Sequence, residues 1–262
     1  MTKREKAWYM IGGSVAFLVT LLVLKQSVTP SPVCDPKVKS KTVILLDHSE
    51  SISKQTADVI VERTWKHIEE NVPAGELITV YEITKFSKTN LQPSFEGCKP
   101  RSQGSQYVEN VKKVERDFKN FKVKLREDLS TPIKMTGEPV ESPIAQALID
   151  MSLDDKHFRS EDVTKLLVFS DLLEYTPKFS LYKSTSSEQA IRDFRASRSG
   201  SVERPSFKHV EVQLHVIPRS IPPQTVQSRD KFWIWFFGDN AGSCKKESCL
   251  NRDDLPGSPK SN

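Results

Sequence analysis

The sequence lacks the patterns that mark several common function classes. Its net charge is only +5, and no long basic stripe with interleaved aromatic residues occurs in it, so a nucleic-acid partner is not supported. The Gly-x-Ser-x-Gly motif of a serine hydrolase is also absent. The 4 cysteines have no Cys-x-x-Cys spacing and the 5 histidines have no ligand or catalytic spacing, which argues against a zinc site.

The amino-terminal region contains an uncharged stretch at residues 7–24, directly after a basic segment at residues 1–6. As a helix, a stretch of this length spans about 27 Å, close to the thickness of a bilayer's hydrocarbon core. A cleaved signal peptide is the alternative, but no Ala-x-Ala-like cleavage site follows Leu24. We therefore expect one transmembrane anchor, with the basic segment in the cytoplasm and the rest of the chain extracytoplasmic. A bacterial inner membrane, with the main domain in the periplasm, is the location that we expect.

All four cysteines lie beyond this stretch, the first of them in a Pro- and Lys-containing tether at residues 25–40. An even count in a translocated domain predicts two disulfides. Three pairings are possible. Cys244 and Cys249 are close enough in sequence to close a local loop, which leaves Cys34 for Cys98.

Between residues 41 and 240, strand-like and helix-like segments alternate. The expected strands are 41–47, 77–86, a short antiparallel edge strand at 90–96, 164–170 and 207–217. The expected helices contain residues 57–72, 107–125, 144–151, 188–194 and the aromatic-rich 232–237, whose aromatic face is expected in the core. This alternation predicts an α/β domain with a doubly wound, mostly parallel central sheet and helices on both faces, preceded by the transmembrane helix. Residues 241–262 are expected to form a polar, cysteine-containing tail.

A cluster of oxygen-bearing side chains follows the first expected strand. Asp47 ends the strand, and Ser49 and Ser51 follow at alternate positions in an Asp-x-Ser-x-Ser motif. In an open α/β sheet, the carboxyl ends of the strands border the crevice where ligands bind. One carboxylate and two hydroxyls present only oxygen ligands, which suit a hard cation such as Mg²⁺ or Mn²⁺.

This motif resembles the opening of the metal-ion-dependent adhesion site of von Willebrand factor A-type (vWA), or integrin I-like, domains. In that family a hydroxyl residue on a second loop and an aspartate after the fourth strand complete the site. Ser142, before the helix at 144–151, and Asp171, after the strand at 164–170, stand at matching places, and the resemblance covers roughly residues 40–237. Two features depart from the family pattern. Position 142 is serine where threonine is usual, and Leu-Leu-Glu follows Asp171 without the frequent glycine.

The resemblance implies that Ser49 and Ser51 bind the metal directly, and that Asp47, Ser142 and Asp171 bind it directly or through water. A site of this kind keeps one coordination position open for an Asp or Glu carboxylate of a protein partner. It holds the partner without breaking a bond, so the resemblance implies a binding module and not an enzyme.

The same residues allow other interpretations. Asp47, Ser49 and Ser51 could form only a helix-capping loop, since Asp and Ser are favoured caps. A phosphatase of the haloacid dehalogenase type also has an Asp after its first strand, but it needs a general acid two residues on, where Ser49 stands. The fold could also be a metal-independent scaffold of an envelope complex, which a test of Mg²⁺ or Mn²⁺ binding would separate from the adhesion module. We expect Glu174 to be solvated at the rim of the site and His48 to point away from it.

Overall fold

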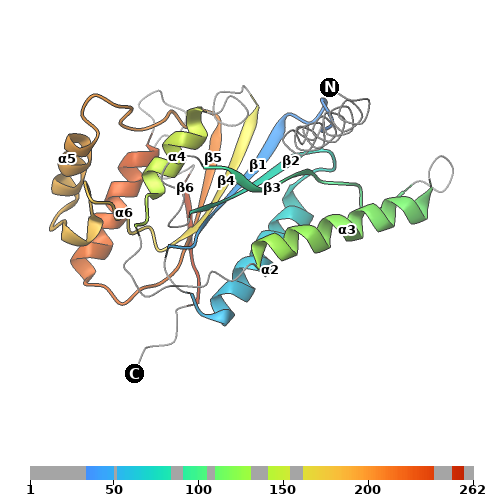
Figure 1. Cartoon of the computed structure of the whole chain (residues 1–262), viewed down its shortest axis with the longest axis horizontal. Helices are drawn as coiled ribbons and strands as arrows, with labels where there is room; N and C mark the ends of the chain where they lie inside the picture. Colours follow the sequence, from blue (N-terminus) through green and yellow to red (C-terminus); the bar gives the residue numbers. More distant parts are fainter. Residues whose placement is uncertain are drawn as a thin grey trace, which may run out of the picture. The chain divides into compact units, whose positions relative to one another are not determined.

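The computed structural model describes residues 34–49, 52–83, 91–104, 110–130, 141–153, 162–238 and 250–256. The strands are β1 (Ser40–Asp47), β2 (Leu77–Ile83), β3 (Pro93–Cys98), β4 (Val163–Ser170), β5 (Val210–Val216) and β6 (Leu250–Asp254). The helices are α2 (Lys54–Asn71), α3 (Val111–Leu129), α4 (Ile144–Leu153), α5 (Ser187–Ser197) and α6 (Pro223–Phe237), with a short 3₁₀ helix η1 (Leu181–Lys183). Figure 1 shows these elements along the chain.

The strands form one six-stranded sheet in the order β3-β2-β1-β4-β5-β6. All neighbouring pairs are parallel except β2 and β3, which are antiparallel. The chain therefore builds the sheet outward in one direction from β1 through β2 and β3, and in the other direction from β4 through β5 and β6. This arrangement confirms the predicted doubly wound, mostly parallel sheet with an antiparallel edge strand.

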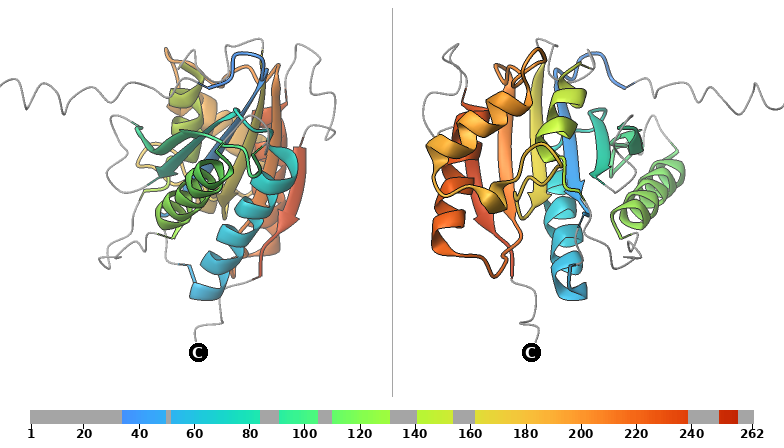
Figure 2. Two further views of the ribbon diagram at one scale, coloured as in Figure 1. Left: turned by 90° about the vertical axis from the view of Figure 1, so that its right-hand side faces the viewer. Right: turned by 60° about the vertical axis from the view of Figure 1, so that its left-hand side comes forward.

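Helices cover both faces of the sheet. Successive residues of a strand point to opposite sides, so a strand with apolar residues at every position must be buried on both. In β1, Val43 and Leu45 face the layer that contains α4, α5 and α6, whereas Ile44 and Leu46 face the layer that contains α2 and α3. Figure 2 shows the two layers on either side of the strands. The continuous apolar run of β1 is thus explained by burial on both faces, as is usual for parallel sheets.

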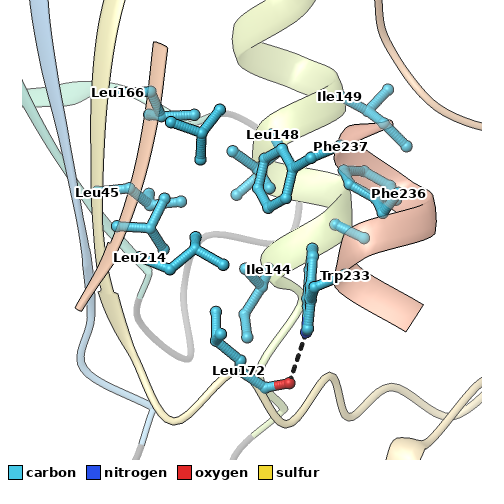
Figure 3. Close-up of a cluster of buried hydrophobic side chains, with 14 of the residues drawn as sticks. Leu45, Ile144, Leu148, Ile149, Leu166, Leu172, Leu214, Trp233, Phe236 and Phe237 are labelled. Carbon is cyan, nitrogen blue, oxygen red and sulfur yellow. Dashed lines mark hydrogen bonds between the residues drawn. The ribbon is translucent and has the colours of Figure 1, made fainter. Parts of the chain in front are cut away.

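The helix starts and the aromatic core agree with the sequence. Ser53 caps α2, where its hydroxyl accepts a hydrogen bond from the backbone N–H of Thr56 at 3.0 Å. In α6, Phe232, Trp233, Phe236 and Phe237 are buried and Trp235 is partly buried against them, which confirms the predicted place of this aromatic face in the core. Figure 3 shows Trp233, Phe236 and Phe237 packed against Leu148 and its neighbours.

The polar segment after residue 240 differs from the expected tail. Residues 250–254 form β6, which extends the sheet beyond β5 with Val212 opposite Leu250 and Val216 opposite Asp254. The expected polar tail included no strand. One forms there because the backbone ladder supplies the pairing, and an edge strand can carry exposed side chains such as Arg252 and Asp254. Without apolar alternation, the sequence offered no signal for this strand.

One predicted disulfide is present, between Cys34 and Cys98, which are separated by 64 residues in sequence. Cys244 and Cys249 lie outside the described residues, as do the predicted anchor at 7–24 and most of the tether. In the part of the chain that the structure describes, no helix has the length and apolar character needed to cross a membrane.

Candidate functional site

The candidate site lies at the carboxyl ends of β1 and β4, which are neighbours at the centre of the sheet. Asp47 is the last residue of β1, and Asp171 directly follows β4. The chain winds away from this point in opposite directions, so the site occupies the topological switch point of the sheet. Ligands bind at such points in open α/β sheets because the loops on either side diverge and leave a crevice.

Asp47 is buried, with only 5% of its surface exposed, and it gathers the surrounding hydroxyls. Its Oδ2 accepts hydrogen bonds from Ser142 Oγ at 3.0 Å and Ser170 Oγ at 2.6 Å. Its Oδ1 accepts a hydrogen bond from the backbone N–H of Ser49 at 3.0 Å. None of these donors carries a positive charge. The described residues therefore hold the Asp47 carboxylate through dipoles alone, which compensates a buried charge only partly.

Ser142 is positioned by a short bridge between the two loops of the site. Its backbone N–H donates to the Tyr175 carbonyl at 2.8 Å, and its own carbonyl accepts from the Tyr175 N–H at 3.0 Å. Pro143 and α4 follow directly, so the residue is also fixed from the helix side. The structure thus brings Ser142 to Asp47, as the sequence predicted.

Asp171 is also buried, but its carboxylate has a charged partner. Its Oδ1 accepts from the Leu173 N–H at 2.9 Å, and its Oδ2 accepts from Arg219 Nε at 3.0 Å. Arg229, buried in α6, donates to the Asp171 carbonyl oxygen at 3.0 Å. The carboxylate is therefore oriented by two donors, one of which is a guanidinium.

Leu172, next in the chain, has a left-handed backbone with φ of 60°, an unusual conformation for a residue with a side chain. Its N–H donates to Ser170 Oγ at 2.8 Å, and its carbonyl accepts from the indole N–H of Trp233 at 2.7 Å (Figure 3). The surrounding contacts thus impose a turn that glycine would adopt more readily. Strained residues of this kind are concentrated at functional sites.

Glu174 corrects one prediction. It was expected to be solvated, but it is only 2% exposed, and its Oε2 accepts from the Ala145 N–H at 2.8 Å. Burial raises its pKa to about 8; hydrogen bonds from the start of α4 oppose this rise, and the negative charge of Asp47 adds to it. The sequence could not show that the first turn of α4 would capture this side chain.

Three residues named from the sequence remain: Ser49, Ser51 and His48. Ser49 is buried beside Asp47, and Ser51 lies outside the described residues. His48 places Nδ1 3.5 Å from Glu82 Oε2, on the face of β1 opposite to Asp47, as expected.

Sequence reasoning missed Ser170 and Arg219. The sequence contained an indication of Ser170. It continues the alternation of Leu166 and Val168, whose side chains point to the same face of the sheet as Asp47. The sequence also contained an indication of Arg219, which is the first charged residue after β5, at the same edge of the sheet.

The donor set fits a hard divalent cation. Within the described residues, no group of three or more His, Cys, Asp or Glu side chains is arranged to hold a metal. The site instead combines the carboxylates of Asp47 and Asp171 with serine hydroxyls, so each group that it offers to a metal is an oxygen ligand. The uncompensated charge of Asp47 is the feature that a cation would neutralise.

No protein-family model and no curated protein matches the chain. Among solved structures, the fold is similar to the ArnB paralog VWA2 from Sulfolobus acidocaldarius, with 12% sequence identity and a TM-score of 0.42. The match covers 82% of this chain and 41% of that protein, so the chain spans less than half of its length. A similarity at this level does not identify the chemistry of the site.

Proposed function

We propose that the chain is a membrane-anchored, extracytoplasmic module of the vWA type that binds a protein partner through a divalent-metal adhesion site. Asp47, Ser49, Ser51, Ser142 and Asp171 would hold Mg²⁺ or Mn²⁺. The bound ion would offer an open coordination position to an Asp or Glu carboxylate of the partner. The chain's own residues then orient the ion and the partner, and no bond is broken.

The observation that carries this proposal is the state of Asp47. A carboxylate that is 5% exposed receives two hydroxyls and one N–H, but no cationic side chain, from the described residues. A buried charge without a cationic partner is costly, and its place at the switch point supports a role in ligand binding. A divalent ion at this place would supply the missing positive charge.

Two further features support the vWA type and the location. The sheet has the order expected for a doubly wound fold, and the pieces of the motif at Asp47, Ser142 and Asp171 lie at one edge of it. The Cys34–Cys98 disulfide is typical of an oxidising compartment, which favours the side of the membrane away from the cytoplasm.

The direct test is metal binding by calorimetry with the full-length chain. Wild type should bind Mn²⁺, and the double change Asp47→Ala/Asp171→Ala should abolish binding while the circular dichroism spectrum of the fold remains. The control Asp58→Ala/Asp117→Ala removes two exposed carboxylates from α2 and α3 and should leave the affinity unchanged. Equal Mn²⁺ affinity in wild type and the Asp47/Asp171 variant would rule out the site.

The partner is tested by crosslinking in membranes. A partner captured with Mg²⁺ should be lost in EDTA and lost with Asp47→Ala, and the two losses should not add because both remove the same bridge. Metal-dependent hydrolysis of an activated phosphate ester would point instead to the phosphatase alternative.

A metal-independent scaffold is the second candidate, and one observation favours it. Arg219 already neutralises Asp171 without a metal. A partner that binds equally well in EDTA would leave the fold unchanged and support the scaffold.

A further inference from the structure

The two aspartates of the site differ in their charged partners. From the described residues Asp47 receives only neutral donors, whereas Oδ2 of Asp171 accepts from Arg219 Nε at 3.0 Å. Asp171 Oδ1 accepts from the Leu173 N–H at 2.9 Å, so both oxygens of this carboxylate are engaged by the protein itself. A cation that binds Asp171 must therefore share it or displace a donor.

Arg219 is built into the site and does not reach it by chance from a distant surface. It lies in the loop after β5, where the Ile217 N–H donates to the Ser170 carbonyl at 2.9 Å. That bond ties the loop to the residue that precedes Asp171 and that itself donates to Asp47. The Arg219 side chain is 17% exposed, so solvent screens its charge only partly.

The guanidinium is a permanent cation, because arginine is not deprotonated in proteins. A divalent ion and a guanidinium that share one carboxylate repel each other. Their binding to Asp171 is therefore linked, and each weakens the other by the same factor. A lysine or a neutral residue at the same place would weaken metal binding less or not at all.

We propose that Arg219 is a resident cation that competes with the divalent ion for Asp171 and thereby sets the metal concentration at which the site fills. This inference rests on the proposed metal site and adds its regulation. In the metal-free protein, the Arg219–Asp171 pair neutralises one of the two aspartates. When the ion binds, the guanidinium must give up part or all of this contact.

Calorimetric titration of the full-length chain with Mn²⁺ tests the proposal. Arg219→Gln should bind Mn²⁺ more tightly than wild type, by about tenfold, which is within the usual range for linked sites. Arg219→Lys keeps the charge but loses the planar fork, and its affinity should lie between the two. Arg195→Gln, on α5, removes the same charge from an ion pair with Glu203, and it should leave the affinity unchanged.

Thermal unfolding separates competition from a merely structural ion pair. In EDTA, Arg219→Gln should unfold at a lower temperature than wild type, because the Asp171 carboxylate has lost its contact with the guanidinium. In saturating Mn²⁺ this difference should shrink or reverse, since the ion takes over the same role. A purely structural pair predicts an equal deficit under both conditions.

The outcomes are distinct. If wild type binds Mn²⁺ and Arg219→Gln binds it equally or more weakly, the competition is refuted and the proposed metal site stands. If Arg219→Gln binds and wild type does not, Arg219 occupies the place of the ion and the competition is supported. If neither binds, the metal site itself fails and the inference fails with it.

Discussion

Buried carboxylates lie at both ends of the parallel strands, and their partners differ. At the amino ends, Glu76 is fully buried, accepts hydrogen bonds from the hydroxyls of Ser40 and Thr42, and has Lys165 Nζ 3.7 Å away. At the carboxyl ends, Asp47 is also buried and receives two hydroxyls, but none of its donors among the described residues is charged. The carboxylate thus has a cationic partner at one end of the sheet, and the described residues supply none at the other.

Lysine side chains at the amino ends of the strands also donate hydrogen bonds to the last backbone carbonyls of α2. Lys99 donates from Nζ to the carbonyls of Ile68 and Val72, each at 2.6 Å, at the last turn of the helix. Lys165 donates to the Asn71 carbonyl at 2.7 Å. These cations satisfy carbonyls that have no partner inside the helix and lie where the helix dipole favours positive charge. The neighbouring Cys34–Cys98 disulfide closes this end covalently.

We interpret the charged groups at the amino ends of the strands as structural, and those at the carboxyl ends as candidates for ligand binding. At the amino ends, charges and hydrogen bonds are matched within the protein, so changes there should alter stability. At the carboxyl ends, the charge of Asp47, the strained Leu172 and the neutralised Glu174 gather around one point. Changes there should alter binding more than stability, and the predictions below follow from this contrast.

The largest expected effect comes from the disulfide at the amino ends. Cys34→Ser/Cys98→Ser should lower the free energy of unfolding by about 4 kcal/mol, because the bond closes a long loop in the unfolded chain. Urea unfolding measures this. Cys244→Ser/Cys249→Ser removes the other two cysteines, which are close in sequence, and serves as the control. Equal losses from the two double variants would contradict a special role for the Cys34–Cys98 bond.

A smaller loss is expected from the buried carboxylate beside that bond. Glu76→Gln should lower the free energy of unfolding by about 2 kcal/mol, because Lys165 loses its charged partner and a charge-assisted hydrogen bond becomes neutral. The control Glu70→Gln changes an exposed residue of α2 and should stay within about 0.5 kcal/mol of wild type. Similar values for the two variants would show that Glu76 is not stabilising.

Much of this architecture could be predicted because the core follows simple periodicity. The apolar run before Asp47, the spacing in α2 and the alternation of β5 each identify an element, and their order implies the parallel sheet. Ser142 and Asp171 could be predicted as candidate site residues because each stands at a recognisable boundary, before a helix or after a strand. The edge strand β6 was missed because its side chains carry no such pattern.

Two polar contacts around the site could not be predicted. The pair of Asp171 with Arg219 joins residues 48 positions apart, and the capture of Glu174 by Ala145 joins residues 29 apart. Such contacts depend on where loops converge after the sheet has formed. Local propensity and periodicity say nothing about that, so the electrostatics of the site had to come from the structure.

The pH dependence of stability tests the carboxyl ends. The folded-state pKa of Glu174, about 8, lies above its ordinary value of 4.5, so the folded protein keeps a proton that the unfolded chain releases between these values. The free energy of unfolding should therefore fall as pH rises through this window, by up to about 1.4 kcal/mol per pH unit, and this contribution should level off above it.

Glu174→Gln keeps the shape of the side chain but has no proton to release. Urea unfolding in EDTA at about pH 5.5 and about pH 7.5 should show a smaller decrease for this variant than for wild type. Glu70→Gln, an exposed change, should keep the wild-type decrease. Identical pH dependence in wild type and Glu174→Gln would show that Glu174 is charged in the folded protein.

The smallest effect on stability is expected at Asp47, although it is buried, with only 5% of its surface exposed. Asp47→Asn is nearly isosteric and removes a charge that has no cationic partner among the described residues. The hydroxyls of Ser142 and Ser170 can accept hydrogen bonds as well as donate them, so they can pair with the new amide. In EDTA, the free energy of unfolding should therefore change by less than about 1 kcal/mol, in contrast to Glu76→Gln, which makes the same chemical change at the other end of the strands.

Mn²⁺ affinity should nevertheless be lost in Asp47→Asn and kept in Glu76→Gln. Calorimetry measures the Mn²⁺ affinity of both variants, and urea unfolding measures their stability. If Asp47→Asn proved the more destabilising change, the contrast between the two ends of the strands would be contradicted, because Asp47 would then stabilise the fold as Glu76 does.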